Sequence, residues 1–252
     1  MGKSLKRWQG RYPIHSYEIA PNGLVRMQSL CRFLQDAAGS HARELGVSVD
    51  QLLPKGLTWM LSRLRVKMQQ LPAWGEILHI ESWPADLQRL YAIRDFQISG
   101  TNEQKIGVAT SAWLLIDISR KRPMRLPEDI RRFHPGEPVR ALEMDMQKIP
   151  PVEKVDDEKS FHVRFSDLDL NRHVNYISYI EWALETVPEA WWQKRYLIDL
   201  ELEYLAESIF GDTVVAQMQL PKADSGIMLH RLFRSGDDRE LIRARTVWRG
   251  KQ

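Results

Sequence analysis

The segment RFSDLDLNRHVNYISYIEWALETV, residues 164–187, joins two unlike parts of the chain. Acid, amide and imidazole side chains alternate at Asp169, Asn171 and His173, and an apolar, aromatic run with helical spacing follows them. Side chains at every second position of an extended segment lie on one face. We therefore expect a polar cluster beside the N-terminus of a helix over residues 175–187.

These residue types in this arrangement suit acyl transfer or hydrolysis. The start of a helix offers unpaired backbone N–H groups and a positive dipole end, which favour a developing oxyanion. Glu207 ends the strand-like segment LELEYLAES, where a sheet strand would bring its carboxylate back beside the helix start. A carboxylate or imidazole activates water and an amide orients it, which is worth roughly 10²–10⁴-fold in rate. The candidate catalytic residues are Asp169, Asn171, His173 and Glu207.

Taken one at a time, the same residues also fit ordinary structural roles. Asp and Asn before a helix are commonly N-caps or turn residues. A single His is commonly a surface or hydrogen-bonded group, and Glu207 within AESIFGD fits a solvated turn. The spacing alone leaves both interpretations open.

Composition bounds the class of protein. The 252 residues, 43% of them hydrophobic, suffice for one large core or two modules. The net charge is +3 and the signs are well mixed, so the overall balance indicates no nucleic-acid partner. The single cysteine, Cys31, excludes an intrachain disulfide and a Cys-rich zinc site and fits a reducing, cytoplasmic location. No apolar run approaches the ~20 residues that span a bilayer, so we expect no membrane passage, export signal or anchor.

The chain is predicted to be duplicated. An offset of 146 positions places Phe33 on Tyr179, and further along an offset of 136 places Gly75 on Gly211. The first copy therefore has ten extra residues between helix and sheet. The predicted organisation is an N-terminal repeat over residues 1–135, a charged, Pro-bearing connector over 136–160 and a C-terminal repeat over 161–252.

Each copy shows the same plan, a helix followed by strands. Apolar residues recurring at three and four predict helices over residues 27–45 and 175–187. Alternation with a period of two predicts antiparallel strands with one solvated face. The strands are expected at residues 64–68, 76–84, 91–99, 107–117, 200–206, 212–220, 227–235 and 241–250. One helix with a curved antiparallel sheet, occurring twice, is an α+β fold.

The polar constellation belongs to one copy only. At the four candidate positions the alignment gives the first copy Gly23, Val25, Met27 and Leu71. A purely structural role would be needed in both copies, so the asymmetry favours a function.

Four segments of the chain resemble a known family. SDLDLNRHVNYISYIEWALE resembles the signature of the fatty acyl–acyl carrier protein (ACP) thioesterases of plants and bacteria, and LELEYLAES resembles the strand with their remaining catalytic acid. YEIAPNGLVRMQSLCRFLQDAAGSHARELG and WLLIDISRKRPMRLPEDI are similar to the family's first-repeat helix region and its later Trp-Asp-Arg-Pro segment, so the likeness covers most of the chain. It implies a tandem double hotdog, in which a long helix in each repeat is wrapped by antiparallel sheet, with an acyl-binding N-terminal repeat and a catalytic C-terminal repeat.

The resemblance also implies a reaction. It is hydrolysis of the thioester between a fatty acyl chain and the phosphopantetheine arm of ACP, which releases free fatty acid and ends elongation, with no cofactor or metal beyond what the substrate carries. By motif, Asp169 and Glu207 would position or activate water, and Asn171 would orient the water or the carbonyl. His173 would support proton transfer and transition-state charge. The division of roles among the two acids and the imidazole stays open.

The position after Glu207 departs from many plant relatives. They carry Cys there, for which a papain-like mechanism was once proposed, whereas this chain carries Ser208. The only thiol, Cys31, falls on the predicted first helix and fits packing. No G-x-S-x-G elbow frames Ser208. We therefore expect direct attack by water without an acyl-enzyme.

The expected partner is ACP, which is acidic. The densest basic cluster, residues 120–125 with Arg131 and Arg132, fits the steering of such a carrier, and it equally fits a solvated loop. The acyl chain is expected against the first helix, which includes Met27, Leu30, Phe33 and Leu34. Chain-length preference and a homodimeric state stay open.

Two other interpretations also stay open. One is a related enzyme, either an acyl-CoA thioesterase or a hotdog dehydratase, although the tandem chain and Glu207 argue against a dehydratase. The other is a non-catalytic acyl-binding protein. The one-sided polar set argues against it, because binding an alkyl chain needs no acid, amide and imidazole.

Overall fold

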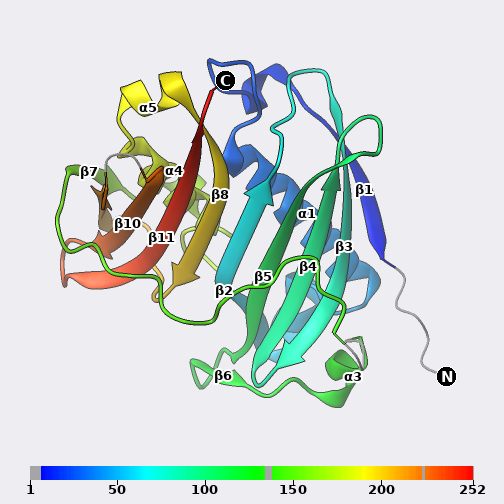
Figure 1. Cartoon of the computed structure of the whole chain (residues 1–252). Coiled ribbons are helices and arrows are strands. Elements are labelled where there is room, and N and C mark those ends of the chain that lie inside the picture. The colour runs from blue at the N-terminus through cyan, green and yellow to red at the C-terminus, as the bar shows by residue number, and fades with distance from the viewer. Residues whose placement is uncertain (1–6, 134–137, 223–224, 252) are drawn as a thin grey trace. The chain divides into compact units, whose positions relative to one another are not determined.

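The computed structural model describes residues 7–133, 138–222 and 225–251 of the chain. The chain divides into two compact units, with the division between Asp145 and Met146. In each unit a helix lies against an antiparallel sheet (Figure 1).

The first unit contains one long helix. Its strands lie in the order β1-β3-β4-β5-β2, and β6 pairs with β5. The strand bounds are β1 Trp8–Pro13, β2 Leu57–Met68, β3 Ile77–Gln88, β4 Tyr91–Ser99, β5 Lys105–Asp117 and β6 Arg122–Met124. Helix α1 (Met27–Glu44) contacts β1 and β3 and buries Leu30, Cys31 and Leu34 on one face. The short helices are α2 (Val49–Leu52) and α3 (Glu128–Arg131).

The second unit repeats this order with equivalent strands. Its order is β7-β9-β10-β11-β8, which corresponds strand by strand to β1-β3-β4-β5-β2 of the first sheet. The strand bounds are β7 Asp157–His162, β8 Arg195–Tyr204, β9 Thr213–Gln219, β10 Ile227–Arg234 and β11 Arg239–Gly250. Helix α4 (Tyr176–Glu185) contacts β7, β9 and β10, and the short helix α5 (Glu189–Lys194) follows it. The predicted α+β architecture, two helices each wrapped by antiparallel sheet, is confirmed.

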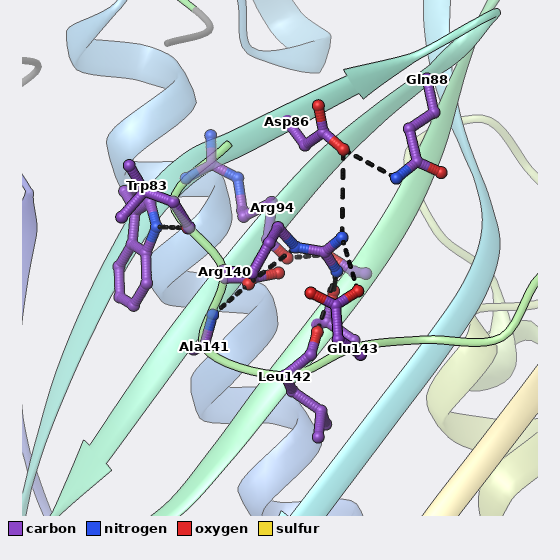
Figure 2. A network of polar contacts seen from close by, with 12 residues as sticks. Trp83, Asp86, Gln88, Arg94, Arg140, Ala141, Leu142 and Glu143 are labelled. Carbon is purple, nitrogen blue, oxygen red and sulfur yellow. Dashed lines mark hydrogen bonds and ion pairs between the residues drawn. The ribbon is translucent and has the colours of Figure 1, made fainter. Parts of the chain in front are cut away.

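The segment Val139–Glu143, which falls within the expected connector, lies along the first sheet. The Val139 N–H donates to Ala85, and the Trp83 indole donates to the Val139 carbonyl at 2.7 Å. Arg140 Nε lies 3.1 Å from an Asp95 carboxylate that is fully buried. Figure 2 shows the Arg140 guanidinium at the centre of this network. The first part of the expected connector is therefore bound to the first unit.

The end of the expected connector is also structured. Residues 157–160, assigned to the connector from the sequence, form the first part of β7. They pair with β9, since Glu158 lies opposite Gln217 and Ser160 opposite Val215. The boundary expected at residues 135 and 136 lies outside the described residues.

The turns before the two helices fix the register of the duplication. An isolated bridge joins Ile19 to Val25 in the first unit, and the corresponding bridge joins Leu168 to Val174 in the second, an offset of 149. The sequence-based offset of 146 is therefore wrong here by three residues. Apolar stripes on a helix recur every three or four residues, so a slip of three leaves the helix pattern nearly unchanged.

Beyond the helix the sequence-based offset of 136 is correct. Leu24 bridges to Ala73 in the first unit, and His173 bridges to Ile209 in the second. The first unit therefore has thirteen extra residues between turn and sheet, rather than ten. The counterparts of the four candidate site residues are Ala20, Asn22, Leu24 and Leu71, and the assignment to Gly23, Val25 and Met27 is wrong.

Candidate active site

Three of the four candidate residues lie in one tight turn before α4. The Asp169 N–H donates to the His173 carbonyl at 2.8 Å, and the Arg172 N–H donates to the Asp169 carbonyl at 3.0 Å. Arg172 takes a positive φ of 64°. The expectation of side chains alternating along an extended segment is therefore wrong, because the chain reverses at Leu170 and Asn171.

The Asp169 carboxylate holds this turn together. One oxygen accepts from the Asn171 N–H at 2.8 Å and from the His173 N–H at 3.3 Å. The other lies 3.5 Å from the Asn171 side-chain amide. An Asp side chain that accepts from backbone N–H groups further along is a common turn device. Asp169 thus fixes where Asn171 and His173 point.

Glu207 meets His173 across this turn. His173 Nδ1 lies 3.1 Å from Glu207 Oε2, and the two side chains are 37% and 63% exposed. Backbone pairing causes the approach, because Val174 donates to the Ser208 carbonyl at 2.9 Å and His173 bridges to Ile209. The expectation that Glu207 returns to the helix start is confirmed, although it lies in the loop after β8 rather than on the strand.

Asp167 anchors the turn to the helix, and the sequence reading did not single it out. Its carboxylate accepts from the Arg164 N–H at 2.8 Å, from the Arg164 guanidinium, and from Ser178 Oγ on α4 at 3.3 Å. Burial raises the pKa of Asp167, but the bonds from Arg164 outweigh it and leave this pKa below its ordinary value. Its carbonyl also accepts from Asn175. The local signal was an acidic residue three positions after Arg164, the N-cap of the short 3-10 helix Phe165–Asp167, which is the spacing of a capping box.

Asn175 is the N-cap of α4. Its side-chain oxygen accepts from the Ile177 N–H at 3.0 Å, which satisfies one of the orphan donors at the helix start. Asn175 therefore caps α4, while Asp169, Asn171 and His173 form the turn before it.

Ser208 is committed to structure. It is fully buried, and its hydroxyl donates to Asp212 Oδ2 at 2.8 Å, an oxygen that also accepts from the Ile209 N–H. Cys31 is fully buried in α1, and burial raises the pKa of its thiol to about 12, which keeps it protonated. Neither side chain is placed as a nucleophile.

The expected basic cluster lies on the first unit. Arg120 and Lys121 form the turn between β5 and β6, and Arg131 ends α3. Arg120 is 66% exposed and lies 3.6 Å from Asp117. Docking of a carrier there stays a prediction.

The described residues contain no group of three or more His, Cys, Asp or Glu side chains arranged to hold a metal ion. Within the same residues, no helix is long and apolar enough to cross a membrane.

Two solved structures share the fold of this chain. An acyl-ACP thioesterase from Bacteroides thetaiotaomicron gives a TM-score of 0.86 at 24% identity and covers 99% of this chain and 100% of that one. The 12:0-ACP thioesterase from Umbellularia californica gives 0.86 at 22% identity, with 97% and 98% covered. At these identities the likeness establishes the fold, a tandem pair of hotdogs.

Family models and curated relatives give the family. The acyl-ACP thioesterase N-terminal domain matches residues 6–133, and the C-terminal domain matches residues 152–250. The chain belongs to the acyl-ACP thioesterase family.

The curated relatives are plant proteins. A chloroplastic palmitoyl-acyl carrier protein thioesterase of Gossypium hirsutum is 30% identical over 95% of this chain, and the chain spans 63% of its length. A chloroplastic oleoyl-acyl carrier protein thioesterase 1 of Arabidopsis thaliana is 27% identical over 97% of this chain and 76% of its own length.

Proposed function

We propose that this protein hydrolyses the thioester of fatty acyl-ACP, releases the free fatty acid and ends fatty acid elongation. The observation that carries the proposal is the His173–Glu207 contact in a turn whose counterpart holds Leu24 and Leu71. Membership of the family supports the substrate class. The one-sided residues Asp169, His173 and Glu207 support hydrolysis over mere binding of an alkyl chain, whereas Asn171 has an equivalent in Asn22 and adds nothing to this argument.

The geometry favours His173 as the general base. If Nδ1–H donates to Glu207, the lone pair of Nε2 is free to accept a proton. In this proposal a water oxygen bonds to the thioester carbon while its proton passes to Nε2. The tetrahedral intermediate then expels the thiolate, which takes the proton back from the imidazolium. No acyl-enzyme forms.

Glu207, Asp169 and Asn171 would support that base. Glu207 would orient the imidazole and stabilise its charged form, which is the role of the acid in a base–acid pair. Asp169 would hold the turn, as its bonds to Asn171 and His173 indicate. Asn171 would orient the water or the carbonyl. Asp169 is thus proposed as a positioning residue, a narrower role than direct activation of water.

The N-terminal repeat would hold the acyl chain. Its helix α1 buries Leu30 and Leu34 against the sheet. On the same helix, His41 Nδ1 lies 3.0 Å from the partly buried guanidinium of Arg94. We keep a reducing, cytoplasmic location and ACP as the partner as parts of the proposal, while the plant relatives are named chloroplastic.

Thiol release from acyl-ACPs of graded chain length and from the matching acyl-CoAs tests the proposal. Wild type should release thiol from ACP substrates with a chain-length optimum, and Asp169→Ala and Glu207→Ala should lose most of that activity. A preference for acyl-CoA would contradict the assigned substrate but keep the site. Release from neither substrate would favour a binding protein.

A further inference from the structure

Large apolar side chains stand exposed around the turn that carries His173. Phe165 is 76% exposed and Leu170, at the tip of the turn, is 78% exposed. Ile209 and Phe210, beside Glu207, are 50% and 62% exposed. The rings of Phe165 and Phe210 lie 6.4 Å apart, edge to face. We call these four residues the apolar rim.

The hotdog fold itself does not need this rim. At the equivalent positions the first repeat carries Ser16, Pro21, Ala73 and Trp74. Three of the four large apolar side chains are thus replaced by smaller ones where the turn has no catalytic set. Exposed apolar residues that gather in one place commonly mark an interaction site. Trp74 and Tyr17 are exposed in the first repeat as well, so the rim is specific to the candidate active site at Phe165, Leu170 and Ile209.

Arg172 gives a second, independent sign. Its φ is +64°, a conformation that costs a non-glycine residue energy, and its counterpart Gly23 takes +79° without that cost. The Arg172 side chain is exposed, and the described residues provide it with no hydrogen-bond or ion-pair partner. A glycine would make this turn more cheaply, so the structure itself gives no reason for an arginine here.

We propose that the apolar rim and Arg172 form the docking surface for the acyl carrier protein, a proposal that rests on the proposed function. A thioester carried on a short arm can reach His173 and Glu207 only if the carrier lies against the residues around them. ACP is acidic, which complements an unpaired guanidinium, while apolar contacts supply the affinity. Four side chains make a small patch, which suits a transient encounter rather than a stable dimer.

The test compares a protein-borne substrate with a small one. The variants are Phe165→Ser with Leu170→Ser, and separately Arg172→Gly. Each is assayed on acyl-ACP and on the N-acetylcysteamine thioester of the same fatty acid, which keeps the reacting bond but has no carrier and no phosphate. Trp74→Ser is the matched control, since Trp74 is 66% exposed at the position equivalent to Phe210.

We expect kcat/KM on acyl-ACP to fall roughly tenfold or more in the docking variants, mainly through KM, as is typical when interface anchors are removed. Turnover of the small thioester should stay unchanged, as should both activities in Trp74→Ser. Arg172→Gly should melt no lower than wild type, because glycine relieves the backbone strain. Binding of a non-hydrolysable acyl-ACP should weaken in both variants, and the loss in Arg172→Gly should shrink at high salt.

Several results would overturn the proposal. Equal losses on both substrates would place the rim within the reacting site, and unchanged kcat/KM on acyl-ACP would place docking elsewhere. Loss of carrier binding on substitution of Arg120 and Arg122, with the rim variants unaffected, would assign docking to the basic cluster. If wild type hydrolyses the small thioester but not acyl-ACP, the carrier is not the substrate; if it hydrolyses neither, the proposed function itself fails.

Discussion

The turn before α1 and the turn before α4 have nearly the same backbone and different chemistry. The bond from Ala20 to Leu24 measures 2.8 Å, and so does the bond from Asp169 to His173. Val25 donates to Pro72 at 2.8 Å, as Val174 donates to Ser208 at 2.9 Å. Yet the first turn carries Ala20 and Leu24 where the second carries Asp169 and His173. A turn and a helix start alone are therefore insufficient for a site, and the polar side chains are an addition to a common scaffold.

The largest effect is expected from removing the imidazole. His173→Leu installs the residue that the first repeat carries and should lower kcat on acyl-ACP by about 10²–10⁴-fold, because the proposed general base is lost. Initial rates of thiol release give the measurement. Leu24→Ala, in the equivalent turn, should leave kcat near wild type; a comparable loss there would contradict a one-sided site.

Removing the carboxylate that holds the turn should have a mixed effect. Asp169→Ala leaves the N–H groups of Asn171 and His173 without their acceptor, which should cost about 1–2 kcal/mol of unfolding free energy. It should also lower kcat by on the order of 10²-fold, because the base is no longer held. Asp169→Asn, which keeps an acceptor oxygen, should recover part of both. Urea unfolding measures the stability of both variants, and initial rates measure their activity. An Asn variant as inactive as the Ala variant would contradict a positioning role for Asp169.

Much of the fold and part of the site could be predicted from the sequence. Period-two alternation located eight of the eleven described strands but missed β1, β6 and β7. The expectation that Glu207 returns beside the start of α4 was correct, since it meets His173 there. The turn geometry could not be predicted, because Arg172 adopts a positive φ that its residue type disfavours. The predicted register of the two turns was wrong by three residues, because a shift of three leaves the pattern of apolar residues on a helix nearly unchanged.

Asp167 shows another limit of sequence reading. Its carboxylate ties the turn to α4 through Ser178 Oγ, which lies eleven residues further on. Such a contact depends on how the turn meets the helix, and no local spacing encodes it. The binding of the Val139–Glu143 segment to the first sheet could not be predicted either. Asp95 interrupts the apolar pattern of its strand, and the sequence does not show that this buried carboxylate accepts a hydrogen bond from Arg140.

Each repeat also buries a histidine outside the candidate site, which predicts a loss of stability in acid. Burial lowers the pKa of His41 and of His230 to about 4, with Arg94 adding to the effect at His41. Between pH 6.5 and 4 the unfolded chain binds protons that the folded one does not, so stability falls as pH falls, by about 1–3 kcal/mol for each histidine. Urea unfolding at pH 7 and pH 5 measures this.

His230→Gln separates the contributions of the two buried histidines to this pH dependence. It should remove the part of the pH dependence that arises in the second repeat and leave the part from His41. A pH dependence identical to wild type would show that His230 does not contribute. Carboxylates with lowered pKa, such as Asp167, lose their contribution only at more acidic pH, so they do not obscure this window.

The smallest effect is expected at the single thiol. Cys31 is fully buried on α1, so Cys31→Ala should cost about 1 kcal/mol of stability through lost packing. Turnover of acyl-ACP should be retained, because direct attack by water needs no thiol. Complete loss of turnover in a folded Cys31→Ala protein, judged by circular dichroism, would contradict attack by water.

The measurement that tests the one-sided site most directly compares Glu207→Leu with Leu71→Ala. The first replaces Glu207 by the residue that its counterpart position carries, and the second alters that counterpart, Leu71, itself. Both proteins should show wild-type melting, and thiol release from acyl-ACP is then followed side by side. We predict near-complete loss for Glu207→Leu and near-wild-type rates for Leu71→Ala. Retained turnover in Glu207→Leu, or equal loss in both, would contradict catalysis by the second repeat alone.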